Sequence, residues 1–417
     1  MERYDAIVVG GGFAGFAAAI SARRAGLNVL LIEKSAALGG AAVNCLVNPF
    51  MPNETKIEDK DGDKLLWLSQ GIFAEIKERL AAEKAIDANG KVFHEEYLKL
   101  VLNRMAVEAG VTLLFHTQLV NASAADGKVS SITVAGKCGL MELTADYFVD
   151  ATGDADLAYL SGFPTRLGRE ADHLCQPMTL CFRVGNVDMD KFIAAWPGIN
   201  PKYKQFQADG KIKNIREDVL VFRNLCHGVL HFNSTRVVRR NPVDAFDLTL
   251  AEIEAREQVF ELFHFLKENI NGFQNADLLF TAPEIGVRES RMIDGEYLLT
   301  GADLVACKRF DDAVALGNYD IDIHNPEGSG TSHYYFPDGQ FYTIPYRSLI
   351  PSGSKNLLVA GRCISADHEA QASIRIMPIV CCLGEAAGTA LGLAAKTGAD
   401  VSDVNGKILR EALGIPV

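Results

Sequence analysis

Apolar runs and small-residue stretches alternate over the first 40 positions of the chain. Residues 4–10 (YDAIVVG) and 28–34 (NVLLIEK) are apolar and contain β-branched side chains, which predicts two buried β-strands. Residues 13–25 between them are mostly small, which suits a helix packed closely on a sheet, and Gly26 is a natural C-terminal cap. The pattern therefore predicts a strand, a glycine turn, a helix and a second strand.

Similar patterns return further along the chain. Residues 111–136 predict a strand, a turn and a strand, and residues 145–150 (ADYFVD) and 357–360 (LLVA) each predict one more strand. A long helix of small residues follows, with Pro378 at its start. Amphipathic helices are expected over 65–84 and 246–270, and the polar residues before 65 predict an exposed excursion.

The glycine turn after the first strand has the spacing of a dinucleotide site. Gly10, Gly12 and Gly15 form GxGxxG, and Glu33 lies 18 positions after the last glycine, near the spacing at which an acid meets a ribose hydroxyl. Such glycines let backbone N–H groups approach a pyrophosphate at a helix N-terminus. The alternative is a turn that needs glycine only for packing. The triplet does not by itself distinguish NAD from FAD.

Composition and charge narrow the class of protein. The chain has 417 residues and a net charge of -12, which argues against broad nucleic-acid binding and against docking on anionic lipid. We find no apolar run of the roughly 18 residues that a membrane span needs and no leader before the first strand. Nine cysteines without paired spacing predict reduced thiols, a cytoplasmic location and no metal site.

Seven segments together resemble one family. They are VVGGGFAGFAAAI, LGGAAVNCLVNPF, FVDATGD, GVRESRMIDGEYLLT, DIDIHNPEG, YTIPYRSLIP and LLVAGRCISADHEAQASIRIMP. The chain resembles the bacterial FAD-dependent oxidoreductases of the glutathione-reductase-like flavoproteins. The resemblance implies an α/β fold, in which a Rossmann-like FAD-binding domain carries an inserted α+β cap. We expect the FAD domain at 1–175, with an excursion at 51–90, the cap at 176–340, and the rest of the FAD domain at 341–417.

The resemblance also implies which residues contact FAD. The glycine pair after Glu33 runs beside FAD in this fold group, and the C-terminal helix points its N-terminus at the flavin, where reduced flavin carries negative charge. The expected FAD contacts are Gly10, Gly12, Ala14, Gly15, Glu33, Lys34, Gly39, Gly40, Ala41, Val120, Ala151, Gly153, Asp154, Gly361, Arg362, Arg375, Met377 and Gly384.

Three differences from relatives in this fold group narrow the reactions that we expect and the way in which FAD is held. Cys45 stands alone where the disulfide reductases carry CxxxxC, which disfavours a flavin-coupled disulfide. A second GxGxxG for a nicotinamide cofactor is not found. No histidine lies near 34–50, so we expect FAD to be held without a covalent bond.

Candidates for the catalytic groups are His368, His324, Tyr346 and Arg347, because they bring donors and a base to loops and strand ends. We expect DIDIHNP, YTIPYR and ISADHEA to meet over the flavin. The predicted function is hydride transfer between FAD and a small polar substrate, for which the family implies a carbohydrate-related compound as one option. The alternative is a structural or non-redox FAD. The electron donor or acceptor and a homo-oligomeric state stay open.

Overall fold

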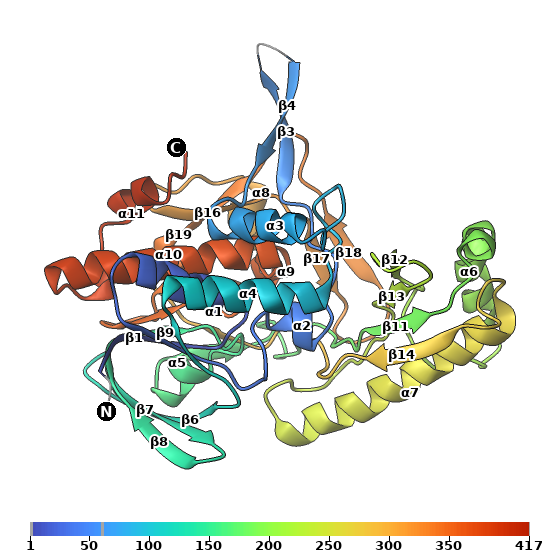
Figure 1. The fold of residues 1–417 in the computed structure, drawn as a ribbon, viewed down its shortest axis with the longest axis horizontal. Helices are drawn as coiled ribbons and strands as arrows, with labels where there is room; N and C mark the ends of the chain where they lie inside the picture. The colour runs from blue at the N-terminus through green and yellow to red at the C-terminus, as the bar shows by residue number, and fades with distance from the viewer. Residues whose placement is uncertain (1–2, 60–61, 417) are drawn as a thin grey trace.

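A five-stranded parallel sheet is the centre of the larger of two bodies in the computed structural model, which describes residues 3–59 and 62–416 (Figure 1). The strand order is β20-β9-β1-β2-β5. The chain runs from β1 to one side and later returns to the other, so the order reverses at the carboxyl ends of β1 and β9, where α/β sheets bind ligands. The strands are β1 (Tyr4–Val9), β2 (Val29–Ile32), β5 (Thr112–Leu114), β9 (Ala145–Asp150) and β20 (Leu357–Val359). Rossmann-type α/β architecture is therefore as predicted.

Two helices rich in small residues pack on each other beside this sheet. They are α1 (Phe13–Arg24) and α10 (Met377–Thr397). A Cβ added to Gly384 would lie 1.9 Å from the carbonyl oxygen of Ala14, so the two backbones approach more closely than any side chain would allow. Helix α10 is long and apolar enough to cross a membrane, contrary to the expectation from the sequence, but 78% of that stretch is buried inside the protein.

The region between β2 and β5 differs from the predicted helix over 65–84. Residues 54–59 and 62–67 pair as two antiparallel strands, β3 (Glu54–Asp59) and β4 (Gly62–Trp67), which project from the body (Figure 1). Helix α3 (Ile72–Ala82) begins only at Ile72, whose N–H donates to the Glu385 carboxylate at 2.9 Å. This contact comes from a segment more than 300 residues away, so periodicity could not reveal it.

The rest of the sheet domain consists of helix α4, an antiparallel meander and several short elements. Helix α4 (Glu95–Ala109) packs on α1, and an antiparallel meander separates β5 from β9. The meander consists of β6 (Gln118–Ala125), β7 (Lys128–Gly136) and β8 (Gly139–Leu143). The short elements are α2 (Ala41–Asn44), α5 (Asp156–Leu160), β10 (Thr165–Leu167), β15 (Arg291–Ile293), α8 (Gly301–Val305), β16 (Ala313–Gly317), β17 (Ile321–His324), β18 (Thr331–Tyr334), β19 (Tyr342–Pro345), the 3-10 turns Tyr346–Leu349 and Val401–Asp403, α9 (His368–Ile374) and α11 (Gly406–Ala412).

The cap is a four-stranded antiparallel sheet with two long helices. The strand order is β12-β13-β11-β14, and α7 falls where a helix over 246–270 was predicted. The elements are β11 (Phe182–Gly185), α6 (Met189–Ala208), β12 (Val221–Arg223), β13 (Leu230–Phe232), α7 (Ala245–Asn269) and β14 (Asp277–Thr281).

The cap is shorter than the predicted 176–340. Its own hydrophobic core runs from Met178 to Ile285 and includes Leu46 from the other body. Residues from Ile293 to Ile350 pack instead in the core of the sheet domain. The hairpin of β17 and β18 therefore belongs to the sheet domain, and it faces the cap across the junction between the two bodies.

Candidate functional site: the glycine turn and the junction with the cap

The glycine turn forms the start of α1 at the carboxyl end of β1. Gly12 is the N-cap of the helix, no side chain caps it, and no acidic residue lies in its first turn. A Cβ on Gly12 would meet only the Cα of Gly40, at 3.8 Å, whereas a Cβ on Gly15 would lie 1.8 Å from the Gly10 carbonyl oxygen. Gly15 therefore serves packing, while the space at Gly12 and the free helix N-terminus suit a pyrophosphate. Ala14, the next predicted contact, lies in this first turn.

Glu33 connects the second strand to this turn. Its buried carboxylate accepts from the N–H of Gly11 at 2.6 Å and from the N–H of Ser35 at 2.8 Å. The acid thus lies against the glycine turn, at the place where a dinucleotide's ribose is bound in folds of this kind. The neighbouring Lys34 pairs with Glu284 at 3.3 Å, which connects the turn to the segment that leaves the cap.

The predicted glycine pair lies directly beside the turn. The N–H of Gly39 donates to the carbonyl of Gly11 at 2.9 Å, and a Cβ on Gly40 would lie 2.8 Å from the Cα of Gly12. Gly40 has a φ of 51° and is the N-cap of α2, which begins at Ala41. Val120 lies further out, exposed on β6. The pair therefore lets a second stretch of chain border the space at Gly12.

A charged pair lies where β9 and β20 end. Arg362 donates to Asp154 at 2.6 Å, and both side chains keep accessible surface, 22% and 26%, although they lie deep in the protein. Within the described part of the chain, Nε of Arg362 is buried without a hydrogen-bond partner. Arg362 also lies close over Gly153. An orphaned donor beside an accessible carboxylate suits the hydroxyls and phosphates of a bound dinucleotide.

The remaining predicted FAD contacts lie just after β9 and β20, at the end of α9 and along α10. Ala151 donates its N–H to Val9 at 2.8 Å, and a Cβ on Gly361 would lie 3.6 Å from the Cβ of Ala14. Arg375 is the C-cap of α9, and Met377 opens α10. Gly384 lies further along α10 and serves the packing on α1. The predicted residues therefore suit FAD. Some of them would contact the cofactor and others pack the helices, and the sequence spacing did not tell these two roles apart.

Cys45 bears on how FAD is held. Its thiol is buried and points at the carbonyl of Ile285 at 3.6 Å. Burial raises the pKa of this thiol to about 12, with Glu284 acting in the same direction. A protonated, enclosed thiol is a poor nucleophile, which agrees with the expectation of non-covalent FAD.

His368 lies at the junction between the two bodies. It is the first residue of α9, and its Nδ1 lies 2.8 Å from Oε1 of Glu289, a fully buried carboxylate. The other oxygen of Glu289 accepts from the N–H of Gln176 at 2.8 Å. A carboxylate that holds one ring nitrogen leaves the other nitrogen for proton transfer, as in other enzyme sites that use histidine.

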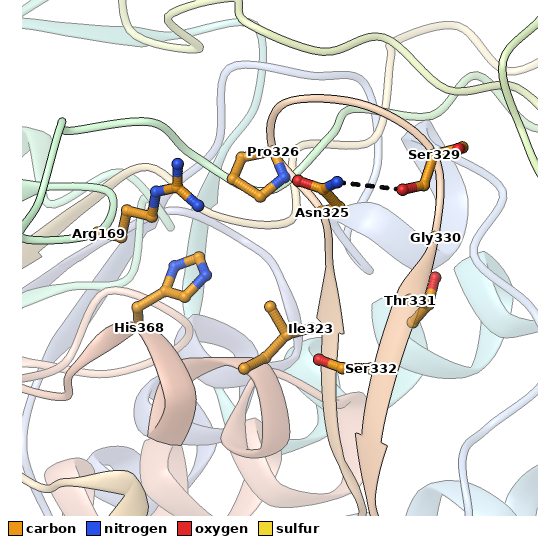
Figure 2. A pocket seen from close by; sticks show the side chains of 9 residues that line it. All are labelled: Arg169, Ile323, Asn325, Pro326, Ser329, Gly330, Thr331, Ser332 and His368. Carbon is orange, nitrogen blue, oxygen red and sulfur yellow. Dashed lines mark hydrogen bonds between the residues drawn. The ribbon is translucent and has the colours of Figure 1, made fainter.

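A shallow pocket of about 420 Å³ opens beside His368 (Figure 2). Figure 2 shows Arg169 and His368 on one side and the hairpin of β17 and β18 on the other. Polar and apolar groups line it together: Arg169, Ile323, Asn325, Pro326, Ser329, Gly330, Thr331, Ser332 and His368. The DIDIHNP and ISADHEA stretches thus come together here.

His324 is buried next to this pocket rather than in it. Its Nδ1 lies 3.0 Å from Nη2 of Arg236 and 3.0 Å from Oγ1 of Thr331, and its Nε2 lies 3.3 Å from Asp322. Burial lowers the pKa of His324 to about 3, and the positive charge of Arg288 acts in the same direction. His324 is therefore neutral near pH 7 and connects the hairpin to the cap.

Tyr346 and Arg347 do not join the histidines, so the prediction that YTIPYR contributes them to the same site is wrong. The hydroxyl of Tyr346 is buried and donates to the carbonyl of Val401 at 2.8 Å. Arg347 pairs with Asp312 at 2.9 Å and is half-exposed. Their segment meets α9 through Tyr342, whose hydroxyl lies 2.6 Å from Oγ of Ser373.

Sequence reasoning did not select the residues that fix this junction. Gln176 and Gln371 bond to each other at 3.1 Å, and Gln371 also donates to the carbonyl of Arg288 at 2.8 Å. Arg236 of the cap donates to the carbonyls of Gly328 and Gly330 in the β17–β18 turn. Gln371 lies within a segment on which the family resemblance rests, but its bond to Gln176 and the contacts of Arg236 arise only in the folded chain.

Comparison with known proteins decides the family. The chain matches the family model described as FAD dependent oxidoreductase over residues 5–413. It belongs to the FAD-dependent oxidoreductases. FAD is thus the cofactor of this family, and the site described above is where the chain offers the features that suit it.

Relatives of this FAD-dependent oxidoreductase match over part of their length. Digeranylgeranylglycerophospholipid reductase 1 of Methanopyrus kandleri is 30% identical over 178 residues, which are 41% of this chain and 45% of the relative. The digeranylgeranylglycerophospholipid reductase of Thermoplasma volcanium is 27% identical over 197 residues, 46% and 49% of the two chains. The chain thus spans about half the length of the curated relatives it matches.

A solved structure is similar over nearly the whole chain. The geranylgeranyl bacteriochlorophyll reductase-like protein of Thermoplasma acidophilum has a TM-score of 0.52 at 14% identity, covering 99% of this chain and 83% of the other. At this identity the likeness shows the fold alone. It supports an FAD-binding fold of mixed α/β type with a parallel sheet.

Proposed function

We propose that this oxidoreductase transfers a hydride between non-covalently bound FAD and a small polar substrate at the junction of the sheet domain and the cap. The observation that carries the proposal is the pair of His368 and Glu289. A buried carboxylate fixes the imidazole beside this pocket, on the element that leads into α10. When an alcohol or amine gives up a hydride, a second group must take the O–H or N–H hydrogen as a proton, and histidine titrates in the right range.

FAD supplies the electron chemistry when it is bound. The chain's own groups would hold the cofactor: Gly12 and the N-terminus of α1 would bind the pyrophosphate, Glu33 would accept from the ribose, and Arg362 with Asp154 would bind the part that links the two. His368 holds or releases a proton at Nε2, while Glu289 keeps Nδ1 occupied. The glycine turn, Glu33 and the Gly39–Gly40 pair support our assignment of the FAD domain to the glutathione-reductase-like group.

The names of the relatives raise a competing substrate class. Digeranylgeranylglycerophospholipid reductases are named for an isoprenoid lipid, whose long apolar chains need an apolar channel. The pocket here instead combines charged and polar side chains, including Arg169 and His368, with the apolar Ile323 and Pro326. We therefore favour a polar substrate. The two reductases named above give no support to a carbohydrate, and as reductases they favour redox FAD over the non-redox alternative. The nine free cysteines support our proposal of a cytoplasmic location.

An anaerobic screen tests the proposal. The FAD-loaded protein is mixed with a panel of small alcohols, amines and hydroxy acids, and separately, after photoreduction, with polar alkenes and with an isoprenoid lipid in detergent. We expect a polar compound to bleach the oxidised flavin or to reoxidise the reduced flavin. Reaction with the isoprenoid lipid alone would overturn the proposed substrate class.

A further inference from the structure

Arg288 is a junction residue that the negative charge of Asp322 reaches without forming an ion pair with it. Its guanidinium donates to the carbonyl of Pro177, to the hydroxyl of Thr179 and to the side-chain oxygen of Asn233. All three acceptors are neutral. Among the residues that the structure describes, none with a carboxylate forms an ion pair with Arg288.

The other arginines buried in and near the junction are paired. Arg236 pairs with Glu217 at 3.1 Å and Arg216 pairs with Asp218 at 3.0 Å. Arg375 lies 3.6 Å from Asp322, and Arg183 contacts Glu95. Arg288 therefore differs from these arginines, each of which forms an ion pair. This contrast argues that Asp322 compensates the charge of Arg288 only in part and leaves room for the charge of a ligand.

The surroundings make the unbalanced charge costly. The pKa of Arg288 is lowered to about 9, by burial first and then by the charges of Arg375 and Arg216, while Asp322 acts in the opposite direction. A buried guanidinium without a counter-charge destabilises the protein unless a ligand supplies one. Arg288 is partly exposed as a residue, although its guanidinium lies deep in the protein. It also adjoins Glu289, which holds His368.

We propose that Arg288 binds an oxyanion of the substrate, so that the substrate class is an acid, a carboxylate or a phosphate ester. The inference rests on the proposed function, because it names the substrate class of the same site. The planar fork of a guanidinium matches two oxygens of such a group. Arg288 is a binding residue in this proposal, and His368 remains the proton-transfer group.

Titration of the FAD-loaded protein tests this without turnover. Succinate, its neutral diamide and inorganic phosphate are added in turn, and the shift of the flavin absorbance gives each affinity. We expect one of the two oxyanions to bind and the diamide not to bind. The two oxyanion arms tell a carboxylate site from a phosphate site.

Variants assign the effect to Arg288. Arg288→Met should weaken oxyanion binding at least tenfold, about 1.4 kcal/mol, and Arg288→Lys should retain part of it. Arg288→Gln keeps a donor for Pro177 and Thr179 and replaces the Met variant if that variant does not hold FAD. Arg239→Met is the matched control, since Arg239 is a cap arginine whose side chain is 64% exposed.

The proposal is overturned if neither oxyanion binds, or if Arg288→Met with full FAD binds within twofold of the unmodified protein. A failed redox screen with intact oxyanion binding would count against the proposed function instead.

Discussion

Gly12 and Gly15, three residues apart, have different roles, and single substitutions should distinguish the two roles. A Cβ on Gly12 fits the protein without a clash, and Gly12 has an ordinary φ of -66°. Gly12→Ala should therefore fold normally, but it should bind FAD at least about tenfold more weakly, because the methyl group occupies the pyrophosphate's approach. Fluorescence titration with FAD gives the affinity, and a thermal melt of the protein without FAD gives its stability.

Gly15→Ala is the contrasting variant. Its Cβ would lie 1.8 Å from the Gly10 carbonyl oxygen, so the turn itself must shift and the protein without FAD should lose stability. Equal FAD affinity in Gly12→Ala and the unmodified protein would show that the cofactor does not approach there.

The pair of His368 and Glu289 makes a second prediction at this scale. His368→Asn should slow flavin reduction by about 10²–10⁴-fold and leave FAD content unchanged, because it removes the proton acceptor and not a cofactor contact. Glu289→Gln should slow the reaction less and displace its pH profile, because the ring loses the negative charge at Nδ1. Rapid mixing with a substrate from the anaerobic screen gives both rates. If Glu289→Gln leaves the pH profile of the reaction unchanged, Glu289 has only a structural role.

At the scale of elements, the contact of α1 with α10 positions both helix N-termini at the cofactor site. Gly384→Ala should destabilise the protein by about 1–3 kcal/mol, because the new methyl group meets the Ala14 backbone at 1.9 Å. Gly198→Ala in α6 is the control, since nothing lies within 4 Å of its Cβ and alanine favours a helix. Urea unfolding measures both. A Gly384→Ala variant as stable as the control would mean that the two helices are not held this closely.

Local pattern predicted some elements well and missed others for a physical reason. The strands around the glycine turn and helix α7 could be predicted because apolar runs and helical periodicity are local properties. The hairpin before α3 could not, because the start of α3 depends on Glu385, far away in the sequence. The end of the cap at Ile285 was also missed, since membership of a core depends on three-dimensional packing.

For the whole molecule, the cofactor site could be predicted further than the catalytic site. The sequence separation between Gly12 and Glu33 is set by the shape of the ligand, so both residues could be predicted from the sequence. His368 was selected for its position before α10, but its partner Glu289 and the unpaired Arg288 gain their meaning only when the cap folds against the sheet domain. Tyr346 was selected by composition, and it is engaged in core packing.

The structure of the FAD-loaded protein is the measurement that tests the proposed redox site most directly. We predict the pyrophosphate against Gly12 at the N-terminus of α1, and the flavin ring at the junction between the first turn of α10 and the segment that carries Arg288 and Glu289. A flavin ring bound away from the cap, with the junction side chains still packed on one another, would contradict the proposal that this junction is the redox site.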